Sequence, residues 1–129
     1  MFPIAKSILK GALQRDECRG AHFKPEFAMP SLDKSDPAER QAEAEQWCAR
    51  FDANNQKWLK STVVSWNGQD PEIRYEDVDT SLIEPRPRLY GLVGAEVIME
   101  VWKVREAKKA AEKNNGSTDK TAETTTVGS

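Results

Sequence analysis

Apolar residues recur at helical spacing in two segments near the ends of the sequence. In residues 4–17 they share one predicted helix face, formed by Ile4, Ile8, Leu9, Ala12 and Leu13. Residues 92–113 repeat the pattern, and lysine and arginine load the last turns, where positive charge suits the helix dipole. The first segment shows a bare apolar face almost from Met1, so we expect the chain to start in the middle of a fold.

A third helix is predicted between these two from its start signals. Asp36 is a suitable N-cap, Pro37 fits the first helical position, and Glu39 completes a capping box. The helix is expected to end near residues 57–59, and residues 18–36 before it are predicted to be mostly loop.

Alternation replaces helical spacing after residue 60. Residues 62–66 and 73–75 are predicted to be two strands of a short hairpin, because the segment between them is rich in turn residues. An isolated hairpin is marginal in water, so it needs a surface to lie on. Residues 77–90 are predicted to be extended, since Pro85 and Pro87 disfavour helix in the residues before them.

The composition indicates one small domain, or a piece of a larger one, with a thin core. The 129 residues are 38% hydrophobic and 31% charged, and residues 114–129 are polar enough to predict a disordered tail. The net charge of −2 gives no long-range attraction to nucleic acid, so no nucleic-acid partner is expected. No apolar run is long enough for a membrane helix, and two cysteines with one histidine cannot complete a zinc site.

The densest group of chemically versatile residues is the segment 15–22. It holds the only histidine, His22, together with Cys18 and two arginines, but nothing makes Cys18 and His22 face each other as a nucleophile pair. The plainest interpretation is a helix C-terminus, with Arg19 satisfying carbonyls and Gly20 as a left-handed cap. The alternative is an interface in which Arg19 and His22 pair with another domain. No catalytic, cofactor-binding or metal-binding residue is predicted.

Three segments carry a family resemblance. Residues 15–27, RDECRGAHFKPEF, closely resemble the C-terminal helical domain of the succinate dehydrogenase and fumarate reductase flavoprotein subunits. That family has a helix ending in Arg-Lys-Glu-Ser-Arg-Gly-Ala-His, so here Asp16 replaces the lysine and Cys18 the serine. Residues 55–62 and 79–90 resemble the next two family landmarks in the right order.

The resemblance implies a mainly α fold. It would be a partial helical bundle, truncated at its N-terminus, over residues 1–90, with a short β-hairpin and an extended segment. Beyond the part that resembles the family, the residue pattern predicts a further helix over residues 91–113 and a disordered tail over 114–129. In this family the FAD-binding and capping domains, which transfer hydride between succinate and the flavin, precede this region. The chain is therefore expected to be a fragment that is inactive alone.

The implied role is to support the flavin domain and the contacts with other subunits. The implied partners are the flavin-binding portion, an iron–sulfur subunit and a membrane anchor, at the cytoplasmic face of the inner membrane. The residues expected at this interface are Arg15, Arg19, Gly20, His22, Trp58, Arg88 and Tyr90. The alternatives are an L-aspartate oxidase-type fragment, a free-standing adaptor derived from the domain, and a redox-sensing protein that uses Cys18 or Cys48.

Overall fold

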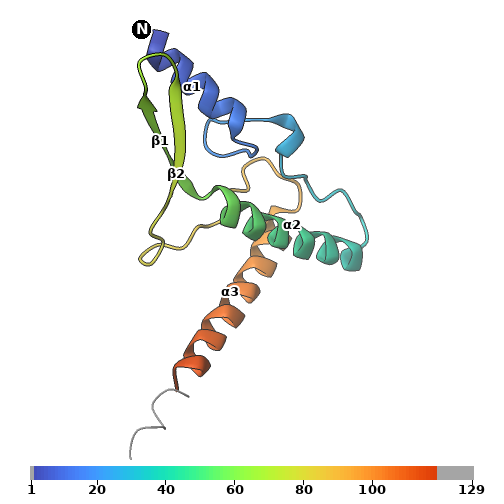
Figure 1. Ribbon diagram of the computed structural model, residues 1–129. Coiled ribbons are helices and arrows are strands. Elements are labelled where there is room, and N and C mark those ends of the chain that lie inside the picture. The colour runs from blue at the N-terminus through green and yellow to red at the C-terminus, as the bar shows by residue number, and fades with distance from the viewer. Residues whose placement is uncertain (1, 119–129) are drawn as a thin grey trace, which may run out of the picture.

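The computed structural model describes residues 2–118 and confirms a mainly α fold with one short hairpin. Figure 1 shows the hairpin beside the first helix, and the last helix projecting from the body of the molecule. In chain order the elements are α1 (Phe2–Gln14), the 3-10 helix η1 (Pro25–Phe27), α2 (Pro37–Trp58), β1 (Lys60–Trp66), β2 (Pro71–Asp77) and α3 (Ala95–Thr118).

The hairpin lies along α1, which supplies the surface that two strands alone lack (Figure 1). The strands β1 and β2 are antiparallel, and their register places Thr62 opposite Tyr75 and Val64 opposite Ile73. The side chains of Thr62 and Ile73 face α1 at Gly11. The Lys10 ammonium reinforces the contact, because it donates a hydrogen bond of 2.7 Å to the Pro71 carbonyl.

The start of α2 follows its predicted cap. The Asp36 carboxylate accepts a hydrogen bond of 3.0 Å from the Glu39 amide, and Pro37 occupies the first turn. The helix ends at Trp58, within the predicted range, and the Leu59 amide still donates to the Asn55 carbonyl at 2.9 Å.

A small core lies where α2 crosses the first turns of α3. It is built from apolar side chains of both helices and one loop residue: Leu32, Ala44, Trp47, Cys48, Ile98, Val101 and Trp102. Phe51 stacks on Trp47, with ring centroids 5.7 Å apart. An ion pair between Arg105 and Asp52, at 2.9 Å, extends the contact beyond the core.

The bounds of α3 differ from the predicted 92–113 at both ends. It begins three residues later because Gly91 and Gly94 take φ angles of 73° and 79°, which are not helical. It continues to Thr118, through residues assigned to the disordered tail, because each added residue of an existing helix gains one backbone hydrogen bond. The remaining part of that predicted tail, 119–129, lies outside the described residues.

The glycine inside α1 offers a test of the packing against the hairpin. A Cβ on Gly11 would lie 3.8 Å from Ile73 Cδ1 and 4.0 Å from Thr62 Cγ2, which is ordinary contact. Gly11→Ala is therefore expected to raise the free energy of unfolding by about 1 kcal/mol, measured by urea denaturation. Gly68→Ala in the hairpin turn, where φ is 99°, should instead lower it. A loss of stability in Gly11→Ala would contradict this packing.

Candidate functional site

A buried carboxylate organises the segment after α1. The Glu17 side chain is fully buried and accepts hydrogen bonds from three neighbours. Arg15 donates through Nε, Arg19 donates through Nε at 2.9 Å, and Asn54 of α2 donates through Nδ2 at 3.1 Å. The two guanidinium groups compensate the buried negative charge, so the cluster fixes this segment against α2.

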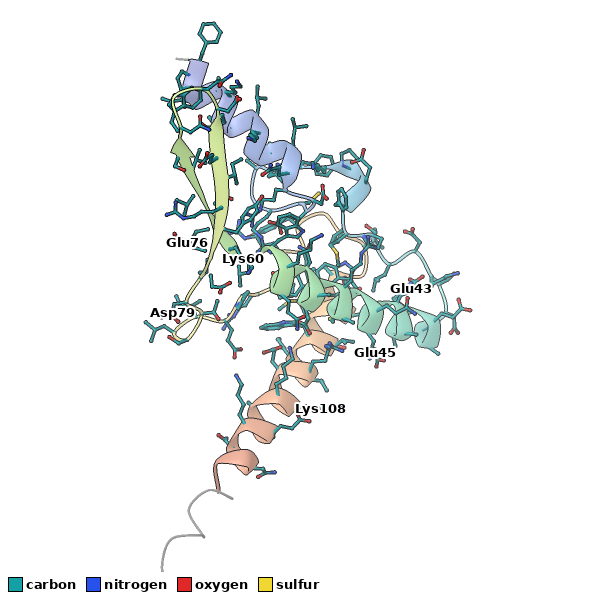
Figure 2. All side chains as sticks on the ribbon, viewed as in Figure 1. Glu43, Glu45, Lys60, Glu76, Asp79 and Lys108 are labelled. Atoms are coloured by element: carbon teal, nitrogen blue, oxygen red, sulfur yellow. The ribbon has the colours of Figure 1, made fainter. Side chains whose placement is uncertain are left out.

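Arg15 ties the same segment to the end of α2 and the start of β1. Its guanidinium donates to the Trp58 carbonyl, to the Lys60 carbonyl at 3.2 Å and to the Thr62 hydroxyl at 3.0 Å. It also lies over the Trp58 ring, 5.7 Å from the centroid. Figure 2 shows the Lys60 end of this junction, where α2 meets the hairpin. One side chain thus holds three elements together.

The segment then reverses direction in a two-residue turn. Arg19 and His22 exchange both backbone hydrogen bonds at 3.0 Å, and Gly20 takes a φ of 61° at the first central position, the pattern of a type II′ turn. The His22 ring contacts the Arg15 carbonyl through Nε2 at 2.9 Å. Arg19 reaches Asn55 of α2 through Nη2 at 2.8 Å.

This geometry corrects the interpretation of Arg19 and Gly20 as a helix C-terminus. The helix α1 ends at Gln14, and Gly20 lies beyond it in the turn. Lys24, rather than Arg19, reaches the last turn of α1, because its ammonium donates to the Leu13 carbonyl at 2.6 Å. The same ammonium pairs with Asp16 at 2.9 Å and holds the pKa of that carboxyl below its usual value.

Four of the seven predicted interface residues line one groove of about 520 Å³: Arg19, Gly20, Arg88 and Tyr90. The groove lies between the segment 18–29, α2 and the segment 86–92. The other three predicted residues, Arg15, His22 and Trp58, meet at the junction of α1, α2 and β1. Arg19 lines the groove and also pairs with Glu17. The junction cluster, which we define as Glu17 with its partners Arg15, Arg19 and Asn54, therefore forms one end of the groove wall.

Two residues that the sequence reasoning did not single out belong to these groups. Glu17 centres the junction cluster, and Arg86 lines the groove beside Arg88. The sequence did contain a signal for Glu17. Arg15, Glu17 and Arg19 are spaced two apart, and alternate residues of an extended segment point to the same side.

The cysteines do not form a reactive pair with the histidine. Cys18 exchanges hydrogen bonds with the backbone of Lys24, at 3.1 and 3.3 Å, whereas His22 contacts Arg15. Cys48 is 1% exposed in the core, and burial raises the pKa of its thiol. Within residues 2–118 no group of three histidine, cysteine or acidic side chains could hold a metal ion.

The two thiols are expected to differ in reactivity. At pH 8, iodoacetamide should modify the half-buried Cys18 at least about tenfold faster than Cys48, because burial and a raised pKa reduce the accessible thiolate. Peptide mass spectrometry over a time course measures both rates. In 8 M urea the two rates should become similar, which controls for local sequence effects. Fast labelling of Cys48 in the folded chain would contradict its place in the core.

No helix in the described part of the chain is long and apolar enough to span a membrane.

The profile of the fumarate reductase flavoprotein C-terminal family matches residues 1–90, which include α1, α2 and the hairpin. No solved structure matches the chain significantly.

Curated relatives agree with the family match. The succinate dehydrogenase flavoprotein subunit of Bacillus subtilis is 34% identical over 92 residues, 70% of this chain. The fumarate reductase flavoprotein subunits of two Helicobacter pylori strains are 31% identical over 99 residues, 73% of this chain. The chain spans 12% and 11% of the lengths of these relatives. By the match over residues 1–90, this chain belongs to the fumarate reductase flavoprotein C-terminal family.

Proposed function

We propose that this chain acts as the C-terminal, non-catalytic part of a flavoprotein subunit that interconverts succinate and fumarate. The observation that carries the proposal is the family match across residues 1–90, supported by relatives that are themselves flavoprotein subunits of succinate dehydrogenase and fumarate reductase. These findings do not favour the L-aspartate oxidase or free-standing adaptor alternatives.

The exposed face of α1 supports a packing role. Five large apolar side chains of this helix are between 64% and 89% exposed: Phe2, Ile4, Ile8, Leu9 and Leu13. Apolar surface concentrated on one element marks an interface. In the proposed role, the flavin-binding part of the subunit covers this face.

We propose that the described residues of this chain do not themselves hold FAD. Dinucleotide phosphates bind where a glycine-rich turn lets them approach the N-terminus of a helix. Gly94 precedes α3, but a Cβ at this position would lie 2.7 Å from the Leu32 side chain, so Leu32 already covers it. We therefore assign FAD and the succinate chemistry to the flavin-binding part of the subunit, and we propose that this chain alone is inactive.

The partners and location follow as part of the same proposal. An iron–sulfur subunit and a membrane anchor would hold the flavoprotein at the cytoplasmic face of the inner membrane. The junction cluster around Glu17 would hold the segment 15–22 in one conformation for the contacts with these partners.

A graft tests the proposed role. The matching C-terminal segment of the B. subtilis flavoprotein subunit is replaced by the whole 129-residue chain, so that α3 and its core are kept. Succinate oxidation with a dye acceptor is expected to recover relative to the truncated subunit. Leu9→Asp with Leu13→Asp should abolish the recovery, whereas Lys103→Asp with Lys108→Asp on α3 should not. A folded graft with no more activity than the truncation would refute the role.

A further inference from the structure

The groove has the composition of a protein interface. Its lining includes four aromatic side chains and a methionine: Phe23, Met29, Trp47, Phe51 and Tyr90. Phe23 and Tyr90 are 68% and 92% exposed, so these rings have large surfaces that no described residue covers. Interface cores are enriched in aromatic residues, methionine and arginine and depleted in lysine and acidic residues. The lining contains no lysine and no acidic residue.

The charge of the groove is opposite to that of the chain. The whole chain carries 21 acidic and 19 basic residues, yet the groove is lined by three arginines, Arg19, Arg86 and Arg88. Arg19 is partly engaged by Glu17 and Asn55. Arg86 and Arg88 are exposed and have no hydrogen-bond or ion-pair partner among the described residues. Exposed guanidinium groups without a partner can bind carboxylates through paired hydrogen bonds.

From these two observations we infer that the groove receives an acidic, extended polypeptide segment of a partner protein, in which carboxylates flank an apolar side chain. The apolar side chain packs on the aromatic wall, and the carboxylates meet Arg86 and Arg88. This inference rests on the proposed interface role and gives the chemistry of one partner. A volume of about 520 Å³ is in the range of pockets that enclose a small ligand or a few side chains.

The test uses the whole 129-residue chain and two blocked peptides in isothermal titration calorimetry. The acidic probe Glu-Glu-Phe-Glu-Glu is expected to bind saturably, and the basic probe Lys-Lys-Phe-Lys-Lys is not. Arg86→Ala with Arg88→Ala should weaken the acidic probe at least about tenfold, because each lost charged hydrogen bond counts for a large part of the affinity. Tyr90→Ser, at an exposed ring, should weaken it severalfold by removing apolar contact.

Lys103→Ala with Lys108→Ala is the matched control. It removes the same charge from exposed positions on α3 that do not line the groove, and Lys108 lies on the projecting part of that helix (Figure 2). It should leave the affinity for the acidic probe within about twofold, because a distant surface charge is screened by salt.

Several results would overturn the inference. These are no saturable binding of the acidic probe, equal binding of both probes, or equal weakening by the two double variants. Tighter binding of a single-stranded oligonucleotide than of the acidic probe would overturn it in favour of a nucleic-acid groove. Failure of the graft is a separate outcome, because the graft depends on α1, whereas the calorimetry needs no flavoprotein. If the acidic peptide binds but the graft fails, the inference about the groove stands and the proposed role in the flavoprotein subunit is refuted.

Discussion

Glu17→Ala is expected to lower the free energy of unfolding by about 3 kcal/mol, because it leaves two guanidinium groups without their shared carboxylate. The Glu17 side chain is fully buried and the Arg15 side chain is only 14% exposed, so water cannot fully replace the partner that Arg15 loses, whereas the Arg19 side chain, at 35%, stays partly solvated. The Asn54 amide loses an acceptor as well. Glu17→Gln keeps one acceptor oxygen but loses the charge, so we expect a loss of about half that size. Urea denaturation of the 129-residue chain, followed by far-UV circular dichroism, measures both.

A surface ion pair provides the control for this prediction. Glu76 pairs with Arg74 at 3.0 Å on the hairpin, where both side chains are more than half exposed. Glu76→Ala should cost less than about 0.5 kcal/mol, since exposed pairs contribute little. If the Glu17 and Glu76 variants unfolded at the same urea concentration as the native chain, the junction cluster would not hold the segment in place.

The sequence predicted those elements whose signals are local. The start of α2 depends on Asp36 and Pro37, which act within one turn, and the observed helix begins where they predict. Alternation and turn residues predict the hairpin, but the observed strands extend past the predicted 62–66 and 73–75 to Lys60–Trp66 and Pro71–Asp77. The start of α3 differs from the prediction by three residues, because Gly91 and Gly94 take non-helical φ angles that the apolar spacing does not reveal.

The candidate site was partly hidden by one wrong helix end. Extending the first helix to residue 17 separates Arg15 from Glu17, because residues two apart on a helix do not face each other. In the structure α1 ends at Gln14, and Glu17 accepts from both neighbouring arginines. Arg88 and Tyr90 were chosen from the family resemblance, since no local pattern shows that the chain brings them beside Arg19.

Gly94→Ala is expected to destabilise the chain by about 3 kcal/mol for two separate reasons. The φ angle of 79° is a left-handed conformation, which costs an alanine about 1–2 kcal/mol. The new Cβ would also lie 2.7 Å from Leu32 Cβ, and such overpacking of a core adds about 1–3 kcal/mol. Gly91→Ala separates the two causes. Its φ of 73° is similar, but nothing lies within 4 Å of the added atom, so we expect only the conformational cost.

A double-mutant cycle with Leu32→Ala identifies the clash itself. Leu32→Ala alone should cost about 2–5 kcal/mol, because Leu32 is 2% exposed in the core. In that background the contacts with Leu32 Cγ and Cδ1 are removed while the contact with Cβ remains, so Gly94→Ala should cost less than in the native chain but still more than Gly91→Ala, with a coupling free energy of about 1 kcal/mol. The same cost of Gly94→Ala in both backgrounds would contradict the close approach of Leu32. A measurable coupling would instead show that Gly94 affects both the start of α3 and the packing of the loop that carries Leu32 onto the core.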